Sequence, residues 1–332
     1  MKQKTIITLL SLLFFQWAFP QQNSKTAIKD KHVQMVPIRD GKYKVWTKKA
    51  GNGKLKLLLL HGGPGSSAEY FFNFPEHLSK DYTIYFYAQL GTQLSDVPKD
   101  TTAYSVDLFV EDIETVRIAL KLDQFYLLGH SWGNSLAQAY AAKYQKHLKG
   151  VVLCNNVNVK DEIVYEYRIE QYADIMEDFP EFKQYADSLR FGFSGKFTDF
   201  STPTSLGNQI QDKVYPEMLK RHYVRLPLPL PEDLANSKIH SNSKLMSELG
   251  FMSKTLSVDY NQYLKEIEKP VLLIGAKYDF IPPKYYVQMK ETLKKSPIAD
   301  ISILNGGHFV MWDDAKNFFK VLDDFVQKVE KR

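Results

Sequence analysis

Residues 129–133 read Gly-His-Ser-Trp-Gly and place a serine between two glycines. An apolar run at 125–128 precedes this segment, and residues 134–144 after it have a composition typical of a helix. A Gly-x-Ser-x-Gly segment between a strand and a helix is typical of a nucleophile elbow, a sharp turn that exposes the serine hydroxyl at the end of a sheet. A side chain in place of either glycine would collide with the adjoining strand or helix. The pattern therefore predicts that Ser131 is a nucleophile that attacks a carbonyl carbon.

A nucleophilic serine needs a base and a group that orients the base. An apolar run at 271–275 ends shortly before Asp279, and a second run at 301–304 ends shortly before His308. Both side chains are therefore expected just after core strands, in the chain order serine, acid, histidine. We expect His308 to take the proton of Ser131 and to return it to the leaving group. Asp279 would hold the imidazole tautomer and stabilise the imidazolium.

Each of these residues, taken singly, has an ordinary structural interpretation. A serine between glycines is usually part of a turn, and His308 is one of eight histidines in the chain. Asp279 would serve as the cap of a helix that begins near Pro283. Their order along the chain and their places at strand ends favour the catalytic interpretation.

A glycine-rich turn, His-Gly-Gly-Pro-Gly at 61–65, follows a further predicted strand at 56–60. Such a turn lets backbone N–H groups face the reacting carbonyl oxygen. We expect the N–H groups of Gly63 and Trp132 to form an oxyanion hole, since Trp132 directly follows the nucleophile. Gly62 is expected to contact the substrate.

Composition narrows the function classes. The 332-residue chain is 44% hydrophobic, which suffices for a large core. Its net charge of +5 comes without a basic cluster, so nucleic acid is not an expected partner. The single cysteine, Cys154, excludes an intramolecular disulfide and falls in an apolar strand pattern, so we expect it to be a buried small residue. No metal site is expected.

The N-terminal segment has the pattern of a signal peptide. Lys2 and Lys4 precede an apolar stretch at 6–15 that is short for a membrane span, and polar residues follow at 21–24. We therefore expect residues 1–22 to be a signal peptide and the protein to be exported, either to a periplasm or to the outside. No stable membrane partner is expected after its removal. The alternative is an uncleaved anchor that lies at the membrane interface.

Strands and helices alternate along the rest of the chain. We expect strands at 32–60 (three of them), 82–87, 150–154, 270–275 and 300–304, and helices at 105–122, 283–294 and 313–329. This alternation predicts a mainly parallel sheet flanked by helices on both faces, formed by residues 30–156 and 265–332. Residues 157–264 interrupt it and are interpreted as an inserted helical cap over the catalytic end of the sheet. The alternative is a surface insertion without a role in substrate binding.

The two glycine-rich segments, 61–65 and 129–133, resemble those of the proline iminopeptidases (prolyl aminopeptidases) of the α/β-hydrolase fold. The likeness covers most of residues 32–330 and includes Gln89-Leu90-Gly91 and Gly307-His308. It implies an α/β-hydrolase that releases an N-terminal residue, often proline, from a short peptide. It also implies that the reaction needs no metal and no cofactor.

The substrate-binding residues show both a match and two departures from this family. Glu248 matches the cap glutamate that binds the substrate's free amine in relatives; otherwise it is a solvated surface residue. Phe280 stands where many relatives have a second amine-binding glutamate, and Ala88 stands where they have an aspartate. Phe280 would replace a negative charge at the amine site with an apolar surface.

Three functions remain open at this point. The first is a serine exopeptidase that acts on small peptides or amides. The second is an esterase, lactonase or amidase on the same fold that does not recognise a free amine. The third is a binding protein on a hydrolase frame, which the intact Ser131, Asp279 and His308 set disfavours.

Overall fold

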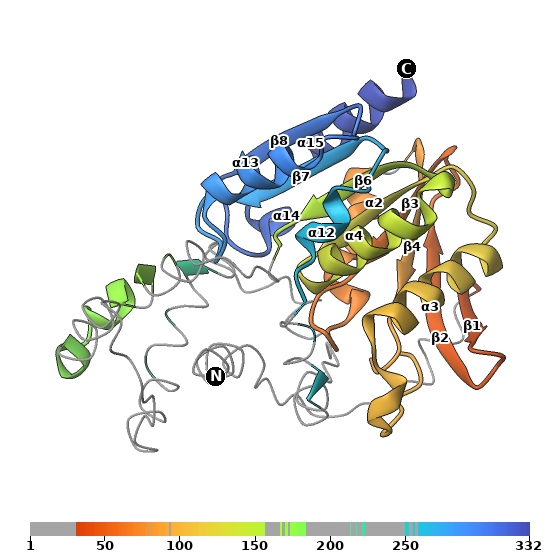
Figure 1. The fold of residues 1–332 in the computed structure, drawn as a ribbon, viewed down its shortest axis with the longest axis horizontal. Coiled ribbons are helices and arrows are strands. Elements are labelled where there is room, and N and C mark those ends of the chain that lie inside the picture. The colour runs from red at the N-terminus through yellow and green to blue at the C-terminus, as the bar shows by residue number, and fades with distance from the viewer. Residues whose placement is uncertain are drawn as a thin grey trace.

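A twisted eight-stranded sheet forms the centre of the computed structural model (Figure 1). The structure describes residues 31–78, 80–92, 94–156, 173–183 and 258–332, with the isolated residues 167, 170, 171, 213, 217, 221, 222, 250, 251 and 255. The strands, in sheet order, are β1 (Val33–Ile38), β2 (Tyr43–Ala50), β4 (Tyr82–Tyr87), β3 (Leu55–Leu60), β5 (Phe125–His130), β6 (Leu148–Cys154), β7 (Val271–Ala276) and β8 (Ala299–Leu304). β2 pairs antiparallel with β1 and β4, and all the other neighbours pair parallel.

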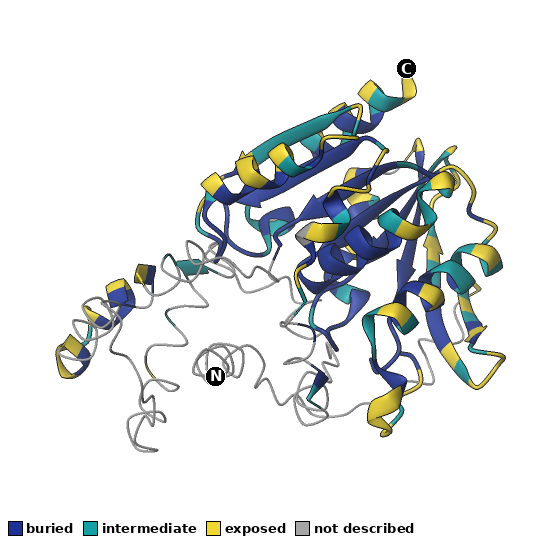
Figure 2. Ribbon diagram, in the orientation of Figure 1, coloured by how far each residue is buried: buried dark blue, intermediate teal, exposed yellow. Residues whose placement is uncertain are grey.

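Helices cover both faces of this sheet, as the alternating pattern predicts (Figure 1). Those described are α2 (Phe74–His77), α3 (Val106–Ala119), α4 (Trp132–Tyr144), α12 (Asn261–Leu264), α13 (Pro283–Thr292), α14 (Val310–Asp313) and α15 (Ala315–Glu330), with the 3-10 turns η1 (Ala68–Phe71), η2 (Thr101–Ala103), η3 (Gln145–His147) and η4 (Pro180–Phe182). Figure 2 shows the central strands as the most deeply buried layer, with exposed residues on the outward faces of the helices.

Two hydrophobic clusters hold the layers together, one on each face of the sheet. Strand side chains alternate between the faces, so Leu58 and Leu60 pack with α3, α4 and α13. Leu57 and Leu59 point the other way and pack with η1, α2 and α15. All four leucines are fully buried, which explains why residues 57–60 of β3 are continuously apolar rather than alternating.

Two predicted helices differ from those observed. The helix predicted at 105–122 ends at Ala119, because Lys121 adopts a left-handed backbone conformation with φ +54°. The helix predicted at 313–329 is α15, which begins two residues later than predicted, at Ala315; the short helix α14 before it was not predicted, and Asp314, with φ −132°, separates the two. The Asp314 carboxylate accepts hydrogen bonds from the Asn305 N–H and the Asn317 side chain, which holds this break in place.

The two predicted segments outside the sheet are less fully described. The predicted signal peptide, residues 1–22, lies outside the described residues. Most of the predicted cap, 157–264, also lies outside them; its described parts include helical residues at 173–176 and the turn η4. Within the described ranges, no helix has both the length and the apolarity needed to cross a bilayer.

A buried ion pair ties the β1–β2 hairpin to α3. The Arg39 guanidinium donates through Nε and Nη2 to the two oxygens of Asp112, at 2.9 and 2.6 Å. Its Nη1 donates to the Ala103 carbonyl oxygen at 2.7 Å. Asp112 is 1% exposed, so its carboxylate depends on Arg39 for the charge compensation that water would otherwise give.

We expect Asp112→Ala to lower the free energy of unfolding by about 3 kcal/mol, because it leaves the Arg39 charge without its partner in a partly buried place. Glu111→Ala on the same helix is the matched control. It removes an exposed pair with Lys143 and should cost less than about 1 kcal/mol. Urea unfolding of the two variants measures the difference; equal losses would contradict a structural role for the Arg39–Asp112 pair.

Candidate active site

The three predicted catalytic residues and the glycine-rich turn all follow the carboxyl ends of parallel strands. Ser131 follows β5, Asp279 follows β7, His308 follows β8, and the glycine-rich turn follows β3. Parallel strands end at the same edge of a sheet, and ligand sites of open α/β sheets form at that edge. The turn lies directly against the serine: a Cβ added to Gly62 would be 2.8 Å from Ser131 Cβ and 3.1 Å from Ser131 Oγ.

Ser131 sits in a strained turn between β5 and α4. Its backbone has φ 59° and ψ −123°, a combination that a side chain normally disfavours. The glycines on either side permit this turn. A Cβ on Gly129 would lie 2.1 Å from the Gly133 carbonyl oxygen, and a Cβ on Gly133 would lie 2.0 Å from the Leu60 carbonyl oxygen. β5 runs to His130, two residues further than the apolar run indicated, so the turn begins at the serine itself.

Asp279 and His308 form a buried hydrogen-bonded pair. His308 Nδ1 lies 2.9 Å from Asp279 Oδ1, and the two side chains are 1% and 0% exposed. Burial raises the pKa of Asp279, but the His308 ring and hydrogen bonds to the carboxylate outweigh burial and hold the pKa below its usual value. A carboxylate only accepts, so His308 Nδ1 carries the proton in this hydrogen bond, and Nε2 is the ring nitrogen that could act as the base.

Two further groups hold the Asp279 carboxylate. The Phe280 N–H donates to Oδ1 at 2.7 Å, and Asn155 Nδ2 donates to Oδ2 at 2.6 Å. Asn155 directly follows β6, adopts φ +44°, and accepts a hydrogen bond from the Cys154 thiol at 2.9 Å. Sequence reasoning missed Asn155. The only signal for it was a polar residue after a strand, which becomes informative once β6 is known to lie beside β7.

The glycine-rich turn is joined to Trp132 through Gln89. The Gln89 N–H donates to His61 Nε2 at 3.0 Å, and its side-chain amide donates to the His61 carbonyl oxygen at 2.7 Å. The Trp132 indole N–H donates to Gln89 Oε1 at 3.0 Å. Gly63 has φ +122°, which favours glycine. Trp132 is the first residue of α4, so its N–H has no partner within the helix and is available to an anion.

The predicted substrate-binding residues lie in different parts of the chain. Gly62 lies against Ser131, as described above. Phe280 is 2% exposed, and its ring centroid lies 5.9 Å from that of His308, so it contributes an apolar surface next to the base. Glu248 lies outside the described residues.

Two described residues of the insertion contact the acid and base loops. Gln171 Nε2 donates to the Asp279 carbonyl oxygen at 3.0 Å. The His308 N–H donates to the His222 carbonyl oxygen at 2.7 Å, and His222 Nδ1 donates to the Tyr278 carbonyl oxygen at 2.7 Å. This part of the insertion therefore packs on the catalytic end of the sheet.

Comparison with known proteins agrees with this geometry. Residues 57–315 match the family model for the alpha/beta hydrolase fold. Proline iminopeptidases of Flavobacterium johnsoniae and Elizabethkingia meningoseptica are 33% and 34% identical to the chain. The first match covers 89% of this chain and 98% of the relative, and the second covers 90% and 99%. The chain belongs to the proline iminopeptidase family of α/β-hydrolases.

A solved structure supports the same fold. The proline iminopeptidase of Mycobacterium smegmatis superposes with a TM-score of 0.67 at 20% identity, over 90% of this chain and 98% of that one. The predicted α/β-hydrolase fold is therefore confirmed. The eight-stranded sheet of this family member places its candidate site at the strand ends described above.

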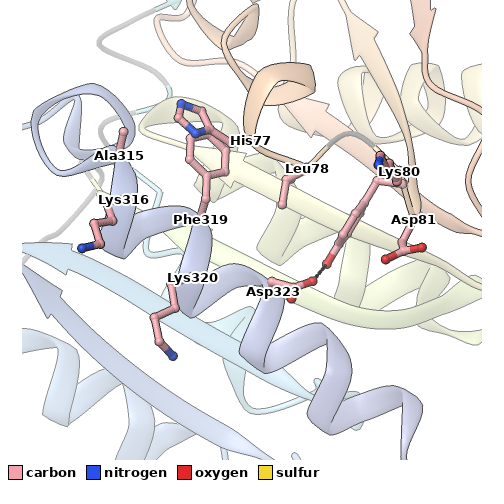
Figure 3. Close-up of a pocket in the computed structure, with 10 residues that line it drawn as sticks. His77, Leu78, Lys80, Asp81, Ala315, Lys316, Phe319, Lys320 and Asp323 are labelled. Carbon is pink, nitrogen blue, oxygen red and sulfur yellow. Dashed lines mark hydrogen bonds between the residues drawn. The ribbon is translucent and has the colours of Figure 1, made fainter.

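A surface hollow of about 860 Å³ lies elsewhere on this family member (Figure 3). His77 and Leu78 line it on one side, and Phe319 and Lys320 of α15 line it on the other. Tyr82, the first residue of β4, also lines it, so the hollow lies at the opposite end of the sheet from Ser131. In the ranges that the structure describes, no three His, Cys, Asp or Glu side chains are grouped to hold a metal ion.

Two buried histidines near the site and the partly buried Glu69 have shifted pKa values. Burial lowers the pKa of His61 to about 4, although a hydrogen bond to the Gly62 carbonyl opposes it. Burial, with the neighbouring His308 ring, lowers the pKa of His130 to about 3. Burial raises the pKa of Glu69 to about 7, although its hydrogen bond with Ser67 opposes the rise. Both of these histidines are therefore neutral at neutral pH.

These shifts predict how stability depends on pH. The ordinary histidine pKa is 6.5, so between about pH 6 and pH 4.5 the unfolded chain binds two protons that folded His61 and His130 do not. The contribution of neutral His61 and His130 to the free energy of unfolding is present at neutral pH and is lost as the pH falls. Glu69 acts in the opposite direction there, because the folded state protonates it first. The net contribution of these three groups is about 1.4 kcal/mol lost per pH unit of acidification.

Urea unfolding at pH 6.0, 5.5 and 5.0 measures this slope for the wild type and two variants. We expect His130→Gln to remove most of the slope, and Glu69→Gln to roughly double it, because each changes the balance by one proton. The second variant is the control for the first, since the two should move the slope in opposite directions. Identical slopes in all three proteins would refute the assignment.

Proposed function

We propose that this chain is a serine exopeptidase that releases an N-terminal residue, with proline or a similar residue preferred, from short peptides. Ser131 Oγ attacks the scissile carbonyl carbon while His308 Nε2 takes the hydroxyl proton. The tetrahedral intermediate then loses its amine as the C–N bond breaks, and protonated His308 gives its proton to the leaving nitrogen. Water activated by His308 hydrolyses the resulting acyl-enzyme and restores the serine.

The buried Asp279–His308 hydrogen bond, at the same sheet edge as the Ser131 turn, is the observation on which this proposal rests. The ionised carboxylate fixes the tautomer with the proton on Nδ1, so that Nε2 is the nitrogen that accepts a proton, and it stabilises the imidazolium that then forms. Asn155 and the Phe280 N–H keep the carboxylate in the orientation that meets Nδ1.

The developing negative charge on the carbonyl oxygen also needs donors. We assign the N–H groups of Gly63 and Trp132 to this oxyanion hole. Support comes from the left-handed backbone of Gly63 and from the place of Trp132 at the start of α4, where the helix dipole adds to the attraction for an anion. Gln89 bonds to both His61 and the Trp132 indole, and so keeps the turn and the elbow at a fixed separation.

Recognition of the substrate needs a site for the free amine and a site for its side chain. We assign the amine to Glu248, because a carboxylate binds an ammonium through charge-assisted hydrogen bonds. We assign Phe280 and Gly62 to the walls of the substrate site next to His308 and Ser131. The names of the curated relatives, proline iminopeptidases, agree with an apolar cyclic N-terminal residue in that place.

The insertion and the N-terminus complete the proposal. We propose that residues 157–264 form a cap over the site, which the bonds from Gln171 and His222 to the acid and base loops support. We also propose that residues 1–22 direct export. Mass measurement of the N-terminus of protein recovered from a periplasmic or culture fraction tests the export proposal.

A paired rate comparison tests the reaction. We expect prolyl p-nitroanilide to be hydrolysed rapidly, its N-acetylated form to be nearly inert because the amine is blocked, and Ser131→Ala to be inactive on both. Alanyl p-nitroanilide measures the preference for proline, and a short-chain p-nitrophenyl ester measures carbonyl hydrolysis without an amine. Hydrolysis of the ester alone would replace the exopeptidase with an esterase, the function that the apolar Phe280 would favour.

Glu248→Ala tests the amine site separately from the chemistry. We expect kcat/KM for prolyl p-nitroanilide to fall about 10- to 100-fold, the loss of one or two charge-assisted hydrogen bonds, while hydrolysis of the p-nitrophenyl ester changes little. The ester is the internal control, since it uses the same nucleophile and base without an amine. An equal loss on both substrates would rule out Glu248 as the amine anchor.

A further inference from the structure

Three consecutive hydrogen bonds link the backbone of Gly62, the side chains of Tyr70 and His130, and the backbone of His308. The Gly62 N–H donates to Tyr70 Oη at 2.5 Å, and Tyr70 Oη lies 2.9 Å from His130 Nδ1. His130 Nε2 lies 2.8 Å from the His308 carbonyl oxygen. Tyr70 is 3% exposed and His130 is 1% exposed, so water does not compete for these bonds.

The direction of every bond in this chain is determined by its two ends. A carbonyl oxygen only accepts, so His130 Nε2 carries a proton and donates it to His308. His130 is neutral because burial holds its pKa at about 3, so Nδ1 is bare and accepts. The Tyr70 hydroxyl must therefore donate to Nδ1, and it accepts from the Gly62 N–H at the same time. No other arrangement satisfies all four groups.

The chain ends on the three parts of the proposed site. Gly62 precedes Gly63, the proposed oxyanion donor, and its α-carbon lies against Ser131. His130 is the last residue of β5 and directly precedes Ser131 in the sequence. The last hydrogen bond ends on the backbone carbonyl of His308. The aromatic rings are also close together: the His130 ring centroid lies 5.2 Å from that of Tyr70 and 4.9 Å from that of His308.

The two peptide groups on either side of the Gly62 α-carbon are each held by a hydrogen bond. Its N–H is bound by Tyr70, and its carbonyl oxygen accepts from His61 Nδ1 at 2.8 Å. The Gly62 carbonyl belongs to the same peptide group as the Gly63 N–H. The His61 bond therefore fixes the plane in which the Gly63 N–H points, and the Tyr70 bond fixes the preceding peptide group, to which that plane is joined at the Gly62 α-carbon. A preorganised donor is what oxyanion stabilisation requires.

We propose that Tyr70 and His130 are positioning residues, which set the oxyanion turn and the base at a fixed separation on either side of Ser131 through this hydrogen-bonded chain. The proposal rests on the proposed function, since it assigns no chemistry to Tyr70 or His130 themselves. Neither residue touches the reacting atoms. Both act through the backbone groups they bind, so their loss should affect the transition state more than substrate binding.

Three variants test the Tyr70 and His130 parts of this hydrogen-bonded chain separately, and a fourth variant is the control. Tyr70→Phe removes the hydroxyl and so the bonds to Gly62 and His130. His130→Gln keeps a side-chain amide that can donate to the His308 carbonyl, whereas His130→Leu fills similar space without any donor. Tyr82→Phe is the control, because it removes one hydroxyl, bonded to Asp323 at 2.7 Å, from the distant hollow.

The measurements are kcat and KM on the best substrate of the paired assay, the rate of fluorophosphonate labelling of Ser131, and the melting temperature. We expect Tyr70→Phe to lower kcat about 10- to 100-fold with KM changed less than about 3-fold, the loss produced by a misplaced donor. His130→Leu should lose as much, and His130→Gln should retain several-fold more activity than His130→Leu. Tyr82→Phe should keep wild-type kcat.

The outcomes distinguish this proposal from the one it rests on. A wild type that is not labelled at Ser131 overturns the proposed function and the positioning role together. A labelled, active wild type with Tyr70→Phe equal to Tyr82→Phe overturns the positioning role alone. If Tyr70→Phe does not fold, the comparison of His130→Gln with His130→Leu tests the proposal instead. Equal activity of these two variants would mean that His130 only fills space, which would overturn the proposal.

Discussion

The close backbone contact between the β5–α4 turn and β3 is the constraint on which the rest of the site depends. Gly133 lies so near Leu60 that a single added carbon would meet its carbonyl oxygen at 2.0 Å. That contact brings the glycine-rich turn after β3 against the serine after β5, and it is possible only because the two strands are neighbours in a parallel sheet. The strained backbone of Ser131 is the local cost of the arrangement, of the order of 1–3 kcal/mol. The fully buried leucines of β3 and the clusters on both faces stabilise the strands enough to maintain it.

Burial gives the site its electrostatic character. A carboxylate removed from water has its pKa raised unless donors replace the lost hydration, and Asp279 receives three: the His308 ring, the Asn155 amide and the Phe280 N–H. The donors come from the loops after three adjacent strands, β6, β7 and β8. The ionised state of Asp279 is therefore a consequence of strand order. The same low-dielectric surroundings strengthen the attraction between this carboxylate and a proton-bearing His308 ring.

The sequence predicted the parts of the site that depend on local pattern and missed those that depend on which strands are adjacent. The Gly-x-Ser-x-Gly segment needs a strand before it and a helix after it, and both can be read from neighbouring residues. Asn155 supports Asp279, which is 124 positions away in the chain, and this pairing follows only from β6 lying beside β7. His130 stood inside the predicted motif, but its bond to the His308 backbone spans 178 positions. The start of the last helix was placed two residues early, because Asp314 accepts from the Asn305 N–H, a bond that forms only once the loop after β8 has folded back onto it.

Three histidines lie within this small buried volume, and their partners give them different roles. His61 accepts from a backbone N–H and donates to a carbonyl, and His130 accepts from a hydroxyl and donates to a carbonyl. Neither has an anionic partner, so burial lowers both pKa values and both rings stay neutral. His308 alone of the three hydrogen-bonds to a carboxylate, so a positive charge that forms here is stabilised on that ring. A charge on His130 would also force its Nδ1 to donate towards the Tyr70 hydroxyl, which would then lose its own acceptor. Neutral His61 and His130 thus keep the hydrogen-bond directions of the site fixed while His308 gains and loses a proton.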